Sequence, residues 1–200
     1  MTEKEKMLRG MLYDADDSAL CADRVRAKEL CHAYNQLRPS DAAGMRELLQ
    51  QLLGKTGETF CVTAPFWCDY GYNIRLGEHF YANHNLVILD CAAVTIGADS
   101  LLGPNIGLYA VNHATDAEAR IHGACWSSPI HIGRRVWLGG DVKVLAGVTI
   151  GDDTIIGAGS VVTKDIPSGV IAAGNPCRVL RVIGAGERTE RERQELEYRK

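Results

Sequence analysis

The chain has 200 residues, a formal net charge of −3 and a pI near 6.1, with 46% hydrophobic and 24% charged residues. This length supports one main hydrophobic core and excludes two full enzymatic domains. No block of basic residues indicates nucleic-acid or anionic-membrane binding, and no apolar run approaches the roughly 18 residues of a membrane span. Residues 1–6 lack the apolar segment of a secretory signal, so we expect a cytoplasmic protein whose partners are small molecules or its own copies.

The seven cysteines are odd in number and scattered, with no Cys-x-x-Cys pair. This spacing argues against a disulfide framework and against a thiolate zinc site. We expect most of them to be small buried hydrophobic residues.

Residues 1–57 are predicted to form a helical region. Thr2 to Glu5 has the spacing of a capping box, and Met7, Leu8, Met11 and Leu12 would share one face of the short helix it starts. A second helix is expected from residues 16–18 and a third from Ser40 to the stop at Gly54. Their apolar stripes are Ala27, Leu30, Cys31 and Tyr34, then Met45, Leu48, Leu49, Leu52 and Leu53.

From about Asn73 the chain follows a six-residue repeat. Counting in sixes gives an unbroken column of aliphatic residues: Ile132, Leu138, Val144, Ile150, Ile156 and Val162. Upstream the same period slips between Ala92 and Thr95, which predicts a bulge or a small insertion. Across residues 110–129 the period disappears, which predicts an extruded loop of the kind that often carries function.

A six-residue period predicts a triangular solenoid, a mainly β fold in which each hexapeptide supplies one flat face and one corner. The aliphatic residue would point inward, and the following Gly, Asn or Asp would take the unusual backbone angles of the corner. Residues 74–109 and 130–163 give nearly four coils. We assign 58–183 to this solenoid and 184–200 to a charged, solvated tail. A short stack leaves sheet edges and faces exposed, so capping helices and self-association are expected.

Several segments resemble the maltose and galactoside O-acetyltransferases. The segments that carry the resemblance are 5–14, 69–74, 80–83, His113 in the loop, 136–140, 157–167 and 174–179. The resemblance implies a left-handed parallel β-helix that forms a homotrimer, with acetyl-CoA as co-substrate in grooves between subunits. It also implies active sites between subunits and no requirement for a metal.

Acetyl transfer from a thioester to a sugar hydroxyl needs a base, donors for the oxyanion and a site that holds both substrates. His113 matches the family's catalytic histidine and is the candidate base. Asn83 matches an asparagine that contacts the sugar or the oxyanion, although a corner residue with left-handed angles is the alternative. Asp14 and Asp69 match positions that hold other sugar hydroxyls, and Asp14 has the alternative role of a helix cap. Tyr81 lines the same cleft or is a core or subunit-contact aromatic residue.

Cofactor contacts are also implied by the resemblance. Trp137 would pack on the pantetheine arm, and small residues would let that arm lie against the backbone. Cationic side chains would face the phosphates, with a solvated surface as the alternative. The full set is Trp137, Gly139, Gly140, Ala158, Thr163, Lys164, Arg178 and Arg181.

The sequence departs from the family in two places near the base. Residues 123–129 offer no carboxylate to orient His113, and Ala114 stands where proline is usual. A backbone carbonyl would then orient the base, and the acceptor pocket would have another shape. The expected reaction is O-acetylation of a glucosyl or galactosyl hydroxyl, with a maltose or glucose type of acceptor, through a ternary complex.

Three alternatives stay open at this point. A hexapeptide acetyltransferase could use a non-sugar acceptor. A γ-type carbonic anhydrase would need a three-histidine metal site, which His79, His84 and His113 match only loosely. A scaffold without catalysis would explain the repeat but not His113, Asn83 and Trp137 together.

Overall fold

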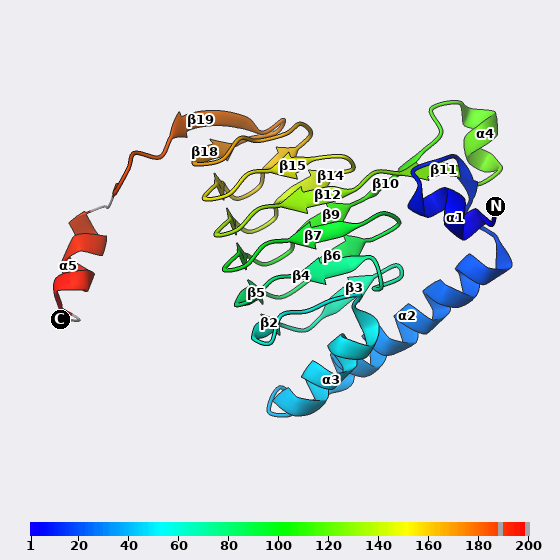
Figure 1. Cartoon of the computed structure of the whole chain (residues 1–200), viewed down its shortest axis with the longest axis horizontal. Coiled ribbons are helices and arrows are strands. Elements are labelled where there is room, and N and C mark those ends of the chain that lie inside the picture. Colours follow the sequence, from blue (N-terminus) through cyan, green and yellow to red (C-terminus); the bar gives the residue numbers. More distant parts are fainter. Residues whose placement is uncertain (188–189, 199–200) are drawn as a thin grey trace.

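The computed structural model describes residues 1–187 and 190–198, and its body is a left-handed parallel β-helix of about six turns (Figure 1). Its first face contains β4 (Ile74–Leu76), β7 (Val94–Ile96), β12 (Ile130–Ile132) and β15 (Thr149–Ile150). The third face contains β3 (Phe66–Cys68), β6 (Leu86–Leu89), β9 (Gly107–Tyr109), β14 (Lys143–Leu145) and β17 (Val161–Val162).

The second face is the widest. It contains β2 (Phe60–Val62), β5 (Phe80–Ala82), β8 (Leu101–Leu102), β13 (Trp137–Leu138), β16 (Ile155–Ile156) and β18 (Val170–Ala173), to which β19 (Arg178–Val182) adds in antiparallel sense. Within a coil the chain passes from the first face to the second and then to the third. The corner between the third and first faces therefore closes each coil.

The aliphatic column predicted from the repeat forms the core of the prism. Ile132, Leu138, Val144, Ile150, Ile156 and Val162 are all buried. Consecutive coils pair in register, as in Ile132 with Ile150 and Leu138 with Ile156. The solenoid predicted from the six-residue period is thus confirmed.

The prediction of unusual corner angles is confirmed for Asn and Asp and was wrong for the glycine that follows each aliphatic residue. The residues with left-handed backbone angles are mostly Asn and Asp later in each corner, such as Asn85, Asn105 and Asp141, with φ values of 63°, 60° and 62°. Glycine is needed at this position because there is no room for a side chain. A Cβ on Gly97 would lie 2.6 Å from the carbonyl carbon of Gly133, and one on Gly139 would lie 2.6 Å from the backbone nitrogen of Ala158. Glycine at this point of the repeat lets neighbouring coils stack closely.

The expectation of nearly four coils was too low, because coils at both ends lack the hexapeptide pattern. β2 pairs with β5 through Cys61 and Tyr81, and β3 pairs with β6 through Trp67 and Val87. At the other end, β16 pairs with β18. The solenoid therefore begins at Phe60, before the six-residue repeat becomes visible near Asn73.

The slip in the repeat and the long interruption fall at the same corner of the prism. The slip corresponds to corner residues 90–93, between β6 and β7. Between β9 and β12 the chain leaves the prism and forms β10 (Val111–His113), α4 (Ala117–Ile121) and β11 (Ala124–Ser127) (Figure 1). β1 (Tyr13–Asp14) joins β11 and β10 in a separate three-stranded sheet.

The N-terminal region contains α1 (Glu3–Leu8), α2 (Ser18–Gln36) and α3 (Ala42–Leu52). The predicted capping box at Thr2 is present, and Asp17 caps α2. α3 begins after an Asp41 cap rather than at Ser40. The predicted shared face of the first helix was wrong: Met7 is buried, but α1 ends at Leu8, and Leu8, Met11 and Leu12 are exposed. Gly10, with φ of +67°, turns the chain before that face can continue.

Side chains of α2 close the open edge of the first coil. The Asn35 side chain accepts a hydrogen bond from the Phe66 backbone N–H (2.8 Å) and donates one to the Phe66 carbonyl (3.0 Å). The Tyr34 hydroxyl donates to the carbonyl of Val62. An unpaired strand edge would expose backbone donors and acceptors, so these contacts give the helical region the role of an end cap.

Replacing Asn35 tests this cap. Asn35→Ala leaves the Phe66 N–H and carbonyl without partners, and we expect the free energy of unfolding to fall by about 1–3 kcal/mol. Urea unfolding at constant m value measures the loss. Gln36→Ala, on the exposed side of the same helix end, is the control, and an equal loss in both variants would contradict the cap.

The seven cysteines are free thiols, and Cys31, Cys68, Cys91, Cys125 and Cys177 are buried, as predicted for most of them. The described part of the tail contains α5 (Glu190–Tyr198), which lies away from the prism (Figure 1) and whose residues 192–198 are exposed. The predicted tail also includes residues 188–189 and 199–200, which lie outside the described residues. Across the described chain, no helix is both long and apolar enough to cross a membrane.

Candidate active site

His113 ends β10, on the segment that leaves the prism. In the three-stranded sheet, His113 is opposite Cys125, and Cys125 is opposite Tyr13. The His113 side chain is exposed, and it has no hydrogen-bond partner among residues 1–187 and 190–198. The backbone carbonyl expected to orient the base forms no hydrogen bond with the His113 side chain among these residues. The imidazole is thus presented to solvent by a short, well-paired sheet.

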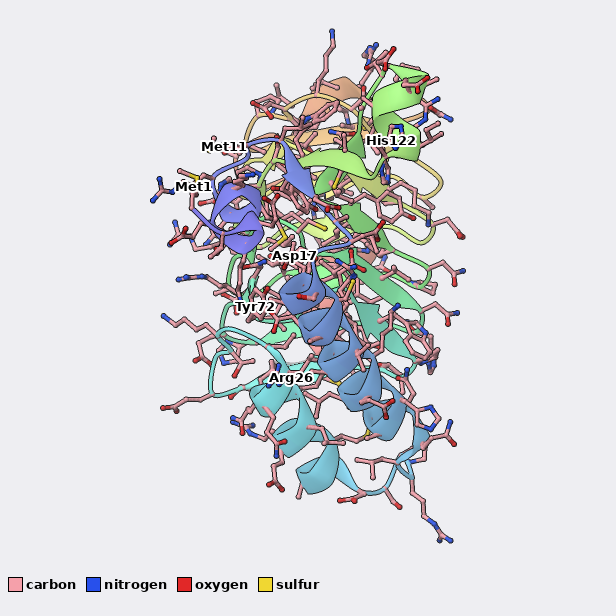
Figure 2. All side chains as sticks on the ribbon, turned by 90° about the vertical axis from the view of Figure 1, so that its right-hand side faces the viewer. Met1, Met11, Asp17, Arg26, Tyr72 and His122 are labelled. Carbon is pink, nitrogen blue, oxygen red and sulfur yellow. The ribbon has the colours of Figure 1, made fainter. Side chains whose placement is uncertain are left out.

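Asp14 lies in the same sheet, opposite Ala124. Its Oδ1 accepts a hydrogen bond from the Asp16 N–H (2.9 Å), and the cap of α2 is Asp17, so the helix-cap alternative for Asp14 was wrong. Asp14 lines a depression of about 270 Å³ with Glu3, Lys6 and His122 among its walls. Figure 2 shows His122 on the extruded segment, to the right of the stretch that runs from Met11 to Asp17.

Asp69 lies at the corner of the prism from which the extruded segment also leaves, two coils before that segment. The Cys91 thiol donates to Asp69 Oδ2 at 3.5 Å. Cys91 packs in one buried cluster with Tyr13 and Cys125, which connects this corner to the strand opposite His113. Burial raises the pKa of Asp69, and the Cys91 hydrogen bond and the charges of Arg24 and Lys28 oppose that rise. The structure therefore gathers Asp14, Asp69 and His113 around a single cluster.

Asp90, which the sequence reasoning missed, fixes the backbone that carries Asp69. Its carboxylate is fully buried and accepts hydrogen bonds from the N–H groups of Asp69 (3.1 Å), Tyr70 (2.8 Å) and Asn73 (3.3 Å). Burial raises the pKa of Asp90 to about 6. The sequence signal that could have identified Asp90 is its position, because it is a carboxylate at the corner where the six-residue period slips.

The raised pKa of Asp90 predicts a pH dependence of stability. A carboxyl group with a pKa near 6 when folded and 3.8 when unfolded binds its proton more tightly in the folded state, so the folded state loses stability as pH rises through this window. The full loss is on the order of 3 kcal/mol, of which about 1 kcal/mol falls between pH 5 and 7.5. Asp90→Asn should remove this part of the slope, as measured by urea unfolding at both pH values. Parallel slopes in the variant and the original protein would contradict this prediction.

Asn83 follows β5 at the corner between the second and third faces. The corner alternative for Asn83 was wrong, because the left-handed residue of this corner is Asn85. The side-chain carbonyl of Asn83 accepts a hydrogen bond from the His84 N–H (2.8 Å). This contact orients the amide so that its NH₂ group, which donates to no described residue, is available to a ligand.

Tyr81 and Trp137 share one outward column on the second face. Tyr81 pairs with Leu101, and Leu101 pairs with Trp137. These three side chains are 37%, 49% and 52% exposed, respectively. The core alternative for Tyr81 was therefore wrong, and both aromatic residues face outward.

The small residues predicted to contact the cofactor stack along the same corner as Asn83. The N–H of Asn83 donates to Leu102, that of Gly103 to Leu138 and that of Gly139 to Ile156. Gly140 and Ala158 follow in the successive coils. A Cβ on Gly140 would lie 3.4 Å from Pro104, an ordinary contact, so this position leaves open surface beside the corner.

The cationic residues separate into two groups. Lys164 and Arg178 line one depression of about 190 Å³ at the end of the solenoid, and the exposed Thr163 precedes Lys164. Arg181 instead forms an ion pair with Glu187 at 2.7 Å. The structure thus brings Lys164 and Arg178 together and gives Arg181 a different partner.

A single chain holds His113 and Asn83 at different corners of the prism. His113 leaves from the corner between the third and first faces, and Asn83 lies between the second and third. Of the histidines in the metal alternative, His79 Nδ1 pairs with Asp99 (2.9 Å) and His84 Nδ1 with the Ala64 carbonyl. In the part of the chain that the structure describes, no group of three His, Cys, Asp or Glu residues is placed to hold a metal ion.

Comparison with known proteins agrees with the fold described above. Residues 129–164 match the family model of the bacterial transferase hexapeptide (six repeats), and residues 6–57 match that of the maltose acetyltransferase hexapeptide capping motif. The fold and these matches define a hexapeptide-repeat acetyltransferase.

Relatives identify the family within that class. A putative acetyltransferase of Saccharomyces cerevisiae, YJL218W, is 45% identical, and the match covers 98% of each chain. The crystal structure of a maltose O-acetyltransferase from Clostridium difficile is 44% identical with a TM-score of 0.91, covering 92% of this chain and 98% of that one. A galactoside acetyltransferase solved with coenzyme A is 42% identical with a TM-score of 0.89, covering 93% of both chains. The chain belongs to the maltose and galactoside O-acetyltransferase family.

Proposed function

We propose that the protein transfers an acetyl group directly from acetyl-CoA to a hydroxyl of a glucosyl or galactosyl sugar, with His113 as general base. The observation that carries the proposal is the exposed imidazole of His113 in a small sheet shared with Asp14, which packs through Tyr13 and Cys125 on Cys91, the hydrogen-bond donor to Asp69. Two carboxylates beside a free base suit an acceptor with several hydroxyls, because carboxylates accept hydrogen bonds from the hydroxyls that do not react.

In the proposed reaction, His113 takes the proton of one sugar hydroxyl as its oxygen attacks the thioester carbon. The C–O bond forms, the carbonyl oxygen becomes an oxyanion, and the free NH₂ of Asn83 donates a hydrogen bond to it. Collapse breaks the C–S bond, and His113 returns the proton to the departing thiolate. The step balances without a covalent enzyme intermediate or a metal.

Acetyl-CoA supplies the activated acetyl group. The proposed contacts are Trp137 for the pantetheine arm, Gly139, Gly140 and Ala158 for the approach of that arm to the backbone, and Lys164 and Arg178 for the phosphates. The shared depression of Lys164 and Arg178 supports the last of these. Thr163 borders it, and Arg181 would have to leave Glu187 to contribute. CoA complexes of relatives support the co-substrate.

A homotrimer would complete the site. The outward apolar column of Tyr81, Leu101 and Trp137 is the surface we assign to the neighbouring copy. In a closed ring, the corner of one copy that carries His113, between its third and first faces, can face the corner of the next copy that carries Asn83, between its second and third faces. The two residues would then line one groove. The cytoplasm is the proposed compartment, because acetyl-CoA is a metabolite of the cell interior.

A thiol assay tests the proposed reaction. CoA release is followed with a thiol reagent on metal-stripped protein given acetyl-CoA and a panel of maltose, glucose, galactosides, amino acids and streptogramin-like acceptors. Release with sugars alone is the expected result. Release with an amine acceptor alone would overturn the sugar proposal and favour the alternative of a non-sugar acceptor.

A further inference from the structure

Arg24 of α2 forms hydrogen bonds to two segments that are far apart in sequence, one at Ala15 and the other at Tyr70. Its Nη2 donates to the Ala15 carbonyl at 2.6 Å, and its Nη1 donates to the Tyr70 hydroxyl at 2.8 Å. The guanidinium carbon also lies 5.8 Å from the centre of the Tyr70 ring. One planar group therefore holds the helical cap and the solenoid in a fixed relation.

The two residues that Arg24 contacts are neighbours of the two candidate acceptor carboxylates. Ala15 follows Asp14, and Tyr70 follows Asp69. The Asp69–Tyr70 backbone is itself fixed by Asp90, whose Oδ1 accepts both N–H groups. The Arg24 guanidinium therefore links the residue after Asp14 to the residue after Asp69.

We propose that Arg24 is a positioning residue for the sugar acceptor, which sets the spacing of Asp14 and Asp69 through Ala15 and Tyr70. This inference rests on the proposed function of those two carboxylates. Arginine suits the task because its rigid fork directs two donors along separate lines, whereas a lysine ammonium is a point charge on a flexible stem. This role has no signal in the sequence, since a charged residue on a helix is usually solvated.

Arg24 also contributes to the charge state of Asp69. Arg24 and Lys28 of α2 lower the pKa of Asp69, as does the hydrogen bond from Cys91. Asp90 is the nearby like charge, and Cys68 and Tyr70 flank Asp69 in the chain. Removing the positive charge of Arg24 would raise the pKa of Asp69. On acidification Asp69 would then be protonated at a higher pH, and acceptor binding that needs the carboxylate would be lost there.

Three variants of the full-length protein test the inference, with maltose and acetyl-CoA as substrates. Arg24→Met should raise KM for the acceptor about tenfold or more, leave KM for acetyl-CoA within about twofold, and move the acid limb of kcat/KM for the acceptor to higher pH. Arg24→Lys keeps the charge but loses the fork, so KM for the acceptor should rise while the acid limb stays in place. Arg26→Met is the matched control: Arg26, labelled in Figure 2, is two residues from Arg24 on the same helix but donates to the Gln51 carbonyl of α3 (2.8 Å) rather than to Ala15 or Tyr70.

The outcomes separate the inference from the proposed function. An unchanged acceptor KM in Arg24→Met and Arg24→Lys, with the original protein active on sugars, would overturn the positioning role alone. Equal rises in KM for both substrates in Arg24→Met and Arg26→Met would show general damage to the helical cap and would also overturn it. If the original protein fails to acetylate any sugar, the proposed function fails instead.

Discussion

His113→Ala should lower kcat by about 10² or more and leave the affinity for acetyl-CoA nearly unchanged. The imidazole is exposed and unpartnered among the described residues, so its removal leaves no buried group unsatisfied and the fold should be retained. The loss falls on the chemical step, because the attacking hydroxyl no longer has a base. Steady-state kinetics give kcat, and calorimetric titration with acetyl-CoA gives the affinity.

His131→Ala is the matched control for this measurement. His131 is also exposed, but it lies on the first face of the prism, outside the small sheet that carries His113. Its replacement should leave kcat within about twofold. Unchanged turnover in His113→Ala would refute the assignment of the base.

Phe66→Ala should lower the free energy of unfolding by about 3–5 kcal/mol. Phe66 is among the largest fully buried side chains, and it belongs to β3 of the first coil, whose edge Asn35 closes. Truncation would leave a cavity between the helical cap and the prism. Urea unfolding at fixed protein concentration measures the loss.

Phe66→Leu is the graded control, since it retains most of the buried volume and should lose clearly less stability. Equal, small losses in both variants would mean that the first coil contributes little to the core. The prediction therefore tests whether the solenoid begins at Phe60, before the hexapeptide repeat is visible in the sequence.

The inner column of the solenoid was predictable because burial repeats with the coil. Ile132 to Val162 occupy equivalent places in successive faces, and each place demands an aliphatic side chain. The number of coils was underestimated because the end coils lack the repeat, and one side of each is covered by other elements: Phe66 lies under α2, and β18 pairs with β19. Where a coil no longer stacks between two others, the hexapeptide constraint relaxes.

The roles of small and polar corner residues were predicted less well. The repeat glycine and the left-handed Asn or Asp are both corner residues. Residue type alone does not show whether a corner position needs a small residue for close stacking of coils or a residue that tolerates a positive φ. The structure separates them: Gly97 is limited by the backbone of the next coil, whereas Asn85 takes the positive φ. That separation also removes the purely conformational explanation of Asn83.

The candidate site was predicted residue by residue only through the resemblance to a family. His113, Asp14 and Asp69 are far apart in sequence. Antiparallel pairing of β11 with both β1 and β10 brings Asp14 and His113 into one sheet. The supporting residues Asp90 and Arg24 carried no repeat position or motif of their own. Their roles follow from burial and hydrogen bonds, which a single sequence does not display.

Product identification tests the central claim most directly. The protein is incubated with maltose and acetyl-CoA labelled with ¹³C in the acetyl group, and the products are examined by mass spectrometry and NMR. The account predicts labelled acetyl ester on a sugar oxygen, formed in equal amount with free CoA and absent with His113→Ala. Free CoA accompanied only by labelled acetate, with no acetylated sugar from maltose, glucose or galactosides, would contradict it.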